Sequence, residues 1–313
     1  MKEYVAQRVL AMIPVLLIVA VFTFSLIQVV PGDPAIILAG DQASPADIAR
    51  VQKRLGLDKP VHEQFWVWMS NALQGDLGVS PGSKFPVLKQ IRLRLEPTVS
   101  IGVAALMISV LVAIPLGVLA AWKVNTWIDR SSMIFAVLAF SIPVFWLEYN
   151  MVYLFAVKLR WLPALGYESI SDGIVPWLRS IAMPSICVGV IAAALPARIT
   201  RSTMLEILKD DYVRTARAKG LRERIVLLRH ALRNAMVPIM TMFGLSLAGM
   251  IGGLVISEQV FAIPGMGRLI VDAVSNRDYP LIQGSLLLIA VSYVIVNLII
   301  DLSYLYFDPR IRY

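Results

Sequence analysis

Six long apolar stretches alternate with polar segments along the chain. A helix that crosses the hydrocarbon core of a bilayer, about 30 Å thick, needs about 20 apolar residues. Lipid offers the backbone no hydrogen-bond partners, so each apolar stretch is expected to satisfy its own peptide groups as a helix. The pattern therefore predicts an all-α membrane protein with six transmembrane helices, at residues 9–30, 98–121, 132–157, 180–200, 236–260 and 284–306.

Composition supports the membrane assignment. The chain is 58% hydrophobic and 16% charged, with a mean hydropathy of +0.72, which is too apolar for the surface of an ordinary soluble domain. The net charge of +8 does not indicate nucleic acid, because the basic residues gather in one loop and at the ends of apolar stretches. One cysteine, Cys187, and two histidines, His62 and His230, leave no disulfide framework and no Cys/His metal site.

The distribution of basic residues predicts the topology. Ten of the 29 Lys and Arg residues lie between positions 198 and 233. Cytoplasmic loops of membrane proteins carry an excess of Lys and Arg. An amino terminus inside the cell places this loop in the cytoplasm, together with both chain ends. The short external loops then carry few basic residues, among them Arg160, Arg179, Arg268 and Arg277. Both termini are therefore expected to be cytoplasmic.

The polar segment between the first two apolar stretches predicts two short helices. Ser44 and Pro45 suit a helix start, and the helix should end at about Leu55, before Gly56. A second, amphipathic helix is expected over residues 61–73, with an apolar face that includes Phe65 and Trp68. Trp66 and Trp68 fit two roles equally well, as anchors at the membrane interface or as contacts with a partner.

The basic loop has an internal pattern of its own. Apolar positions recur at helical spacing from Leu205 to Lys219, Gly220 interrupts the pattern, and a second helical pattern follows from Arg222 to Leu232. A helix, a glycine and another helix form a compact element. It would serve either as a docking surface for a cytoplasmic partner or as an amphipathic loop on anionic lipid. The internal pattern favours docking.

No nucleotide-binding or catalytic motif is present, and no convergent constellation of His, Asp or Ser residues spans the apolar stretches. The sequence does not indicate an enzyme. If the protein drives active transport, the energy must come from another subunit or from an ion gradient.

The basic loop resembles the coupling loop of ABC importer permeases, which docks on a cytoplasmic ATPase. The general motif of that loop is Glu-Ala-Ala, three residues, then Gly. Here Arg214, Thr215 and Ala216 take the first three places, so Ala216 and Gly220 match. This departure is the pattern of the peptide and nickel branch. The resemblance implies that the ATPase-coupling residues are Asp211, Tyr212, Arg214, Thr215, Ala216, Arg217, Ala218, Lys219 and Gly220.

Seven further motifs, in order, resemble the first permease of dipeptide and oligopeptide importers. They are Pro31-Gly32-Asp33-Pro34, Leu55-Gly56-Leu57-Asp58-Lys59-Pro60, Gly75-Asp76-Leu77-Gly78, Ser141-Ile142-Pro143-Val144-Phe145-Trp146, Pro264-Gly265-Met266-Gly267-Arg268, Arg277-Asp278-Tyr279-Pro280 and Asp308-Pro309-Arg310-Ile311-Arg312. The resemblance implies a type I ABC importer permease fold in the bacterial inner membrane. The implied cargo is a short peptide, with glutathione and nickel or other metal chelates as alternatives.

The resemblance also implies partners and a division of the chain. The partners are a homologous second permease, two cytoplasmic ATPases that carry ATP and Mg, an extracytoplasmic binding protein and membrane lipid. No cofactor is expected in this chain. The expected divisions are a first helix at 1–30, an external cap at 31–96, and a core permease domain at 97–313 with its coupling loop at 201–235. Phe65 and Trp66 in the cap are candidate contacts for the binding protein.

Polar and glycine positions inside the apolar stretches are candidates for the translocation path. An ionisable residue at the bilayer centre costs about 2.5–3.5 kcal/mol or more, so it is a functional candidate by default. Glu148 and Asn150 follow an expected kink at Pro143, and Glu258 ends the fifth stretch. Alternatively, Glu148 lies near the external interface. Glu258 lies near the external face, where it would serve as a gate, as a contact for the binding protein or as a solvated helix end. Gly249 and Gly253 permit close approach of another helix, either as a gate or as static packing.

The main rival in another class is a self-sufficient, ion-coupled secondary transporter. Such proteins usually carry internal repeats and polar residues near the bilayer midplane. We find no repeat within the chain and few such polar residues, so the sequence favours the importer permease.

Overall fold

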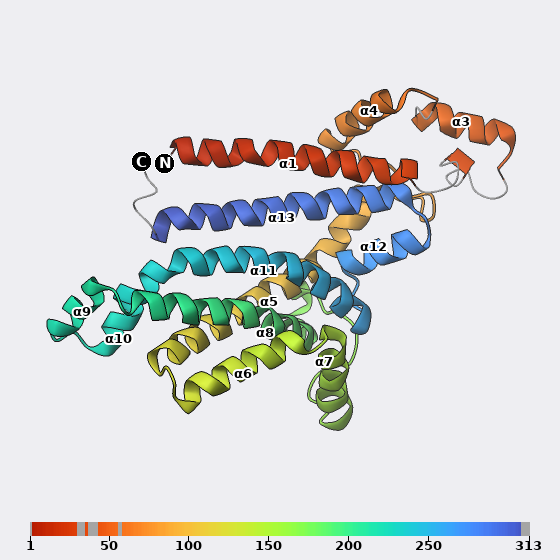
Figure 1. The fold of residues 1–313 in the computed structure, drawn as a ribbon. Helices are drawn as coiled ribbons and strands as arrows, with labels where there is room; N and C mark the ends of the chain where they lie inside the picture. Colours follow the sequence, from red (N-terminus) through yellow and green to blue (C-terminus); the bar gives the residue numbers. More distant parts are fainter. Residues whose placement is uncertain (1, 30–34, 37–42, 56–57, 308–313) are drawn as a thin grey trace. The chain divides into compact units, whose positions relative to one another are not determined.

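The computed structural model describes residues 2–29, 35–36, 43–55 and 58–307, and these residues are mostly helical (Figure 1). The motifs at 31–34 and 308–312, and residues 56–57, lie outside the described residues. The α-helices are α1 (Lys2–Val29), α3 (Pro45–Leu55), α4 (Val61–Leu73), α5 (Val87–Trp122), α6 (Trp127–Ser141), α7 (Val144–Met151), α8 (Ile174–Ile207), α9 (Asp211–Ala218), α10 (Glu223–Ile225), α11 (Leu232–Val260), α12 (Met266–Ser275) and α13 (Tyr279–Phe307). A 3₁₀-helix η2 (Ile170–Asp172) and two π-helices, η1 (Val152–Lys158) and η3 (Val226–Ala231), complete the order.

Five helices of the described chain are long and apolar enough to cross a membrane: Ala6–Leu26, Val87–Trp122, Ile174–Ile207, Glu223–Val260 and Tyr279–Ser303. The expected sixth span, 132–157, is not one straight helix. Its two parts, Trp127–Ser141 and Val144–Lys158, are bent by 99°. Pro143 explains the bend, because proline lacks an N–H and forces the preceding residue out of the helical region. Ile142 is accordingly extended, with φ −81° and ψ 125°.

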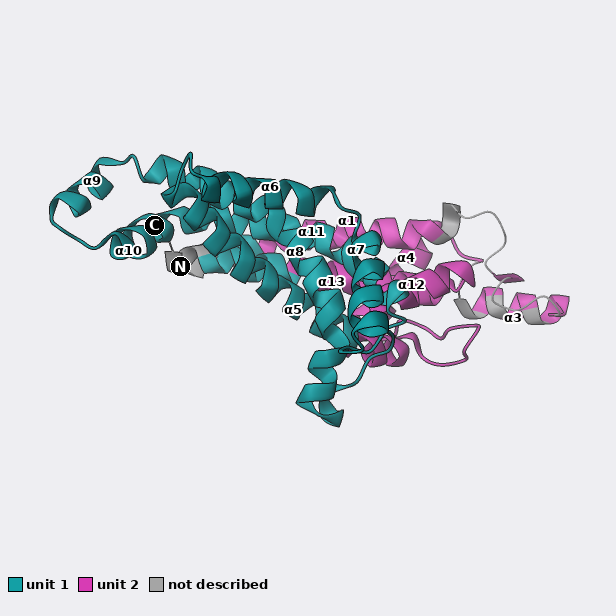
Figure 2. Ribbon diagram, turned by 90° about the horizontal axis from the view of Figure 1, so that it is seen from below, with its two compact units in different colours: residues 1–8, 97–264, 295–313 teal, residues 9–96, 265–294 magenta. Residues whose placement is uncertain are grey.

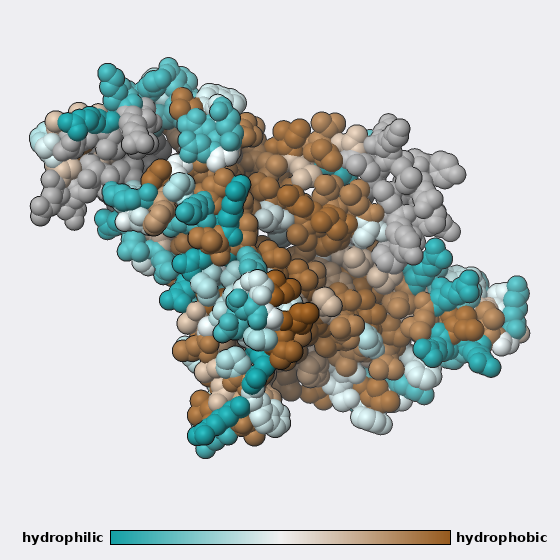
Figure 3. Space-filling view, turned by 180° about the vertical axis from the view of Figure 1, so that it is seen from behind, coloured by the Kyte–Doolittle hydropathy of each residue, from teal (hydrophilic) through white to brown (hydrophobic). Residues whose placement is uncertain are grey.

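The chain divides into two compact units, which Figure 2 shows in different colours. Unit 1 contains residues 1–8, 97–264 and 295–313, and unit 2 contains residues 9–96 and 265–294. Exposed large apolar side chains are numerous on both, and Figure 3 shows how densely apolar side chains cover one face. Such a surface is expected where lipid or another subunit replaces water.

The core of unit 1 is formed by α5, α8 and α11. Its largest cluster includes Ala113 of α5, Ala197 of α8 and Phe243 of α11. Small residues let α5 and α8 approach closely. A methyl group at Gly117 would lie 2.5 Å from Thr200 Cβ, and one at Gly189 would lie 2.7 Å from the carbonyl oxygen of Ala105. These two contacts hold α5 and α8 together as one layer.

Unit 2 has its own core and polar contacts. Val87 and Ile91 of α5 pack against Met266, Leu269 and Ala273 of α12. A buried hydrogen bond from the Ser80 hydroxyl to the Asp278 carboxylate fixes the turn before α13. Gln283 of α13 donates to the carbonyl oxygens of Thr23 and Phe24, at 3.4 and 3.5 Å, so α13 is tied to α1 within this unit.

Both short helices predicted between the first two apolar stretches are present. α3 begins at Pro45 and ends at Leu55, and α4 spans Val61–Leu73, as the capping and proline signals indicated. Phe65 and Trp68 of α4 contact the ring of Phe24, with ring centroids 5.5 and 5.9 Å apart. Trp66 is 63% exposed and remains available for a partner or the membrane interface.

The basic loop differs from its predicted division. The helix expected over Leu205–Lys219 is two helices, because α8 ends at Ile207 and α9 begins at Asp211. The chain turns over residues 208–210, and Asp210 is extended, with φ −64° and ψ 147°. The helix expected to end at Leu232 instead continues through η3 into α11. Tertiary packing explains the turn, since it brings Val213 onto buried neighbours.

Candidate coupling site and translocation path

Helices α9 and α10 and the π-turn η3 form a helical hairpin, residues 211–231, which we call the coupling hairpin. Val213 and Ala216 of α9 are buried against Val226 of η3, with Ile207 and Leu208 at the end of α8 alongside. These contacts fix the hairpin to the end of α8. α9, η3 and the end of α8 therefore share one packed cluster.

An ion pair closes the hairpin. The guanidinium of Arg217 donates two hydrogen bonds to the Glu223 carboxylate, from Nη2 at 2.7 Å and from Nε at 3.2 Å. The hydrogen bond with Glu223 raises the pKa of Arg217 above its usual value. Gly220 lies between these residues with φ +74°, a left-handed conformation that favours glycine. Gly220 thus makes the turn that brings the two side chains together.

A second contact ties the hairpin to the start of α11. Asn234 donates from Nδ2 to the Tyr212 hydroxyl at 2.7 Å, and that hydroxyl lies 3.5 Å from the carbonyl oxygen of His230. α9 is thereby joined to α8 by apolar packing, to η3 through the carbonyl oxygen of His230, and to α11 by the hydrogen bond from Asn234.

The nine residues predicted to couple the ATPase all lie on this hairpin, in distinct environments. Ala216 is buried and serves packing, and Arg217 pairs with Glu223. Except for Ala216, all of them are exposed: Asp211, Tyr212, Arg214, Thr215, Arg217, Ala218, Lys219 and Gly220. Asp211 and Arg214 form a surface ion pair at 3.3 Å. The surface open to a partner is therefore basic, with Tyr212 as its aromatic residue.

Two buried carboxyl groups lie at the last turn of α11, one on that turn and one on α7. Glu148 of α7 and Glu258 of α11 are both 0% exposed. Glu148 accepts a hydrogen bond from the Ser257 hydroxyl, and its second oxygen has no hydrogen-bond partner among the described residues. Glu258 accepts from the Thr98 hydroxyl of α5 at 2.5 Å. Successive residues of α11 thus link it to α7 on one side and to α5 on the other. We call these four residues the α11-end cluster.

The other path candidates lie apart from this cluster. Asn150 is exposed and donates to the carbonyl oxygen of Trp146 at 2.6 Å, so it does not join Glu148. A side-chain carbon at Gly253 would contact Val188 at an ordinary 3.6 Å, and at Gly249 it would meet nothing within 4 Å among the described residues. Gly249 therefore faces open space in this single chain.

One hollow of unit 1 was not predicted. Its volume is about 390 Å³, and it lies between the loop after η1 and the start of α8. Arg160, Glu168 and Arg179 line it together with apolar side chains. Arg179 also donates to the carbonyl oxygen of Trp161 at 2.7 Å. No sequence motif marks this hollow, because its charged residues come from separate segments.

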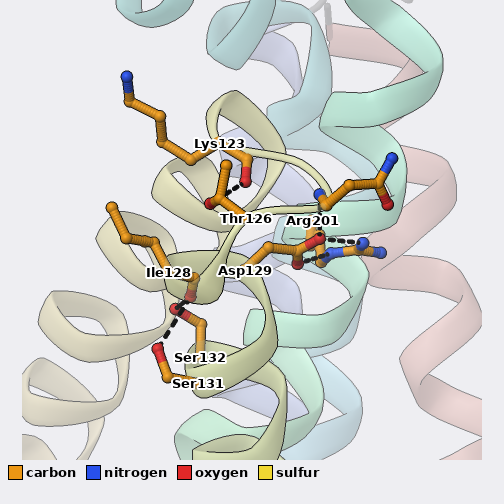
Figure 4. A network of polar contacts seen from close by, with 8 residues as sticks. Lys123, Thr126, Ile128, Asp129, Ser131, Ser132 and Arg201 are labelled. Atoms are coloured by element: carbon orange, nitrogen blue, oxygen red, sulfur yellow. Dashed lines mark hydrogen bonds and ion pairs between the residues drawn. The ribbon is translucent and has the colours of Figure 1, made fainter.

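A second unpredicted feature lies between α6 and α8. Asp129 of α6 accepts two hydrogen bonds from Arg201 of α8, at 2.5 and 2.7 Å (Figure 4). The two residues are 72 positions apart in the sequence, so no local sequence pattern predicts that they pair. Within the described parts of the chain, no group of three or more metal-ligating side chains is found.

Comparison with known families identifies the protein family of this chain. Residues 113–313 match the binding-protein-dependent transport system inner membrane component family, and residues 1–101 match the N-terminal domain of such membrane components. The chain belongs to this family. It is an ABC transporter permease, a multi-pass protein of the inner membrane.

Relatives of this permease match it over its whole length. It is 46% identical to the probable peptide ABC transporter permease protein y4tP of Sinorhizobium fredii, over 100% of both chains. It is 44% identical to the glutathione transport system permease GsiC of Pectobacterium atrosepticum, again over 100% of both. The dipeptide transport system permease DppB of Alkalihalophilus pseudofirmus is 38% identical, also over 100% of both.

A solved structure supports the fold. A chain of the inward-facing MetNI methionine ABC transporter superimposes with a TM-score of 0.58 at 15% identity, covering 70% of this permease and 96% of that chain. The expected ABC importer permease fold is confirmed. At this identity the likeness concerns the fold alone.

Proposed function

We propose that this permease forms half of the translocation path of an ATP-driven importer for short peptides. The observation that carries the proposal is the agreement of three full-length relatives, named for peptide, glutathione and dipeptide transport. Glutathione is itself a tripeptide, so the three names share one chemical class. Glutathione is the second candidate cargo. No such support exists among these relatives for a nickel or metal-chelate cargo.

The proposed assembly contains a homologous second permease, two cytoplasmic ATPases and an extracytoplasmic binding protein. A binding-protein-dependent family implies the last of these. Exposed apolar side chains on the long helices suit the second permease and lipid. We place both termini and the coupling hairpin in the cytoplasm, because the hairpin lies within the basic stretch at 198–233.

The coupling hairpin is the proposed ATPase contact. Its exposed residues, Tyr212, Arg214 and Lys219 among them, offer an aromatic ring and positive charge to the ATPase surface. Its buried residues, Val213 and Ala216, hold it against α8. ATP-driven movement of the ATPases would therefore carry the hairpin and the end of α8 together, and alternate opening of the path follows from that movement.

The path candidates keep distinct proposed roles. In this structure Glu148 bonds the Ser257 hydroxyl and Glu258 bonds the Thr98 hydroxyl, so the end of α11 is joined to α7 and α5. Both carboxylates become available to a cationic group of the cargo only after these helices separate. Asn150, Gly249 and Gly253 are proposed to line the path or the contact with the second permease.

The proposed division of the chain keeps the first helix at 1–30, the external cap at 31–96 and the permease core at 97–313, with a coupling loop at 201–235. Phe65 and Trp66 of the cap are proposed contacts for the binding protein. Exposure of Trp66 supports this role, while Phe65 also packs on Phe24.

Co-purification tests the proposed assembly. The tagged chain is extracted from native membranes in a mild detergent, and co-purifying proteins and small molecules are identified by mass spectrometry. We expect two ATPases, a second permease, and a binding protein that carries a short peptide or glutathione. Recovery of the chain alone, under conditions that keep other importers intact, would contradict the proposal and favour a self-sufficient transporter.

A further inference from the structure

The Asp129–Arg201 pair joins two helices near the coupling hairpin. Asp129 lies in the first turn of α6 and is 4% exposed. Arg201 approaches it with two N–H groups, Nε to Oδ1 at 2.5 Å and Nη2 to Oδ2 at 2.7 Å (Figure 4). A bidentate contact of this kind fixes orientation as well as distance, because two parallel bonds restrict rotation.

The same carboxylate holds the turn between α5 and α6. Oδ2 of Asp129 also accepts from the backbone N–H of Asn125 at 3.0 Å, and Asn125 has a left-handed φ of +64°. The neighbouring Arg130 is exposed, and Lys123 lies with Nζ 4.2 Å from the Trp122 ring centroid. Asp129 thus bonds both the turn and α8, so this one carboxylate links α6, the turn before it and α8.

The Asp129–Arg201 pair lies near the end of α8 that contacts the coupling hairpin. Arg201 precedes the end of α8 at Ile207, and Ile207 contacts the buried face of the coupling hairpin. Close packing at Gly117 and Thr200, next to Arg201, holds α5 on α8 at the same level. The end of α8 that receives the hairpin is therefore the end that Asp129 holds.

α6 continues from Asp129 toward the other end of unit 1. After the 99° bend it leads into α7, where Glu148 bonds Ser257 of α11. A continuous series of contacts thus runs from the hairpin through α8, the ion pair, α6 and α7 to the α11-end cluster. All of these residues belong to unit 1.

We propose that Asp129 and Arg201 are positioning residues that make α6 and α7 move with the coupling hairpin, so that ATPase movement reaches Glu148 of the α11-end cluster through α6 as well as through α11. This inference rests on the proposed function, since it requires ATP-driven transport. A buried ion pair is weak evidence for stability, because desolvation offsets the attraction. Its role here is transmission: without the pair, α8 moves and α6 lags behind it.

Three variants test the pair in the assembled transporter: Asp129→Asn, Arg201→Gln and the double variant Asp129→Asn/Arg201→Gln. The double variant matters because it removes the bidentate ion pair without leaving a buried charge unpaired. Asp272→Asn, which weakens the exposed Arg268–Asp272 pair with its 4.0 Å separation, is the matched control. The readout is the amount of ATP hydrolysed per peptide imported, at equal amounts of complex.

We expect all three variants to assemble with the ATPases and hydrolyse ATP, with about a fivefold or greater rise in ATP used per peptide, the lower end of typical couplings between sites. The double variant should match the single variants, since all three lack the same link. Arg201→Lys should fall between Arg201→Gln and the original chain, because lysine lacks the planar fork that makes the bidentate contact.

A merely structural pair would lower the amount of complex or its melting temperature but leave ATP used per peptide unchanged, and that result would overturn the inference. So would a double variant whose effect equals the product of two independent single effects. If a single variant fails to accumulate, the double variant and Arg201→Lys decide the question alone. Absence of ATP-driven peptide uptake with the original chain would instead reject the proposed function.

Discussion

The close approach of α5 and α8 at Gly117 makes a quantitative prediction. Replacing Gly117 by alanine would place a methyl carbon 2.5 Å from Thr200 Cβ and 2.7 Å from the carbonyl oxygen of Ala197. Ordinary contacts between non-bonded carbon atoms are about 3.5–4.0 Å. Ala197 contributes a backbone atom to this contact, so no side-chain rotation relieves it. The two helices must move apart along their shared surface.

The magnitude follows from two opposing effects. Overpacking a well-packed core costs typically about 1–3 kcal/mol, and contacts this short favour the upper end. Alanine gains about 1 kcal/mol over glycine inside a helix. The expected net loss at Gly117 is therefore about 2 kcal/mol. Gly252→Ala is the matched control, because a methyl group there meets nothing within 4 Å among the described residues. That variant should be neutral or slightly stabilised.

The assay is the apparent melting temperature of the detergent-solubilised complex, followed by tryptophan fluorescence at one fixed scan rate. A loss of about 2 kcal/mol corresponds to a decrease of about 4–8 °C for a chain of 150–250 residues, and an effect of this order is expected here. A Gly117→Ala protein that melts at the same temperature as Gly252→Ala would refute the tight α5–α8 contact.

Three further predictions concern the coupling hairpin and the α11-end cluster. Arg217→Gln should change the melting temperature by no more than about 1 °C, because exposed ion pairs contribute little to stability. It should nevertheless weaken ATPase co-purification, because the contact that closes the hairpin with Glu223 is lost. Recovery of the ATPases equal to that of the original chain would contradict this role of the ion pair. Gly220→Ala should be destabilised by about 1–2 kcal/mol because of its left-handed φ, and Gly220→Asn less so, as compared by melting; equal losses would argue against the turn geometry. Glu148→Ala should lower the melting temperature more than Glu148→Gln, because only glutamine keeps an acceptor for the Ser257 hydroxyl; the reverse order would contradict the bond.

Local signals predicted the local structure well. α3 and α4 begin and end where the capping residues, prolines and apolar spacing indicated. Pro143 indicated the kink, since its effect on the preceding residue is steric and local. The basic loop was divided wrongly because its helical spacing continues across residues 208–210. The turn packs Val213 and Ala216 against Val226, and this tertiary contact leaves no signal in the local spacing.

Contacts between distant segments could not be predicted. Glycine spacing singled out Gly249 and Gly253 for close helix approach, whereas the shortest approaches within unit 1 lie at Gly117 and Gly189. Spacing shows where a helix is narrow but not which neighbour it meets. Likewise, Glu148 stood out as a buried carboxyl group, but its bond to Ser257, 109 positions away, required the fold.

ATP-dependent uptake in proteoliposomes tests the central claim most directly. The purified permeases and ATPases are reconstituted, the binding protein is added outside, and accumulation of a labelled dipeptide and of labelled glutathione is measured with and without ATP inside. We predict accumulation of at least one of these cargoes that requires ATP and the binding protein together. Uptake by this chain alone, driven by an ion gradient and indifferent to ATP, would contradict the account.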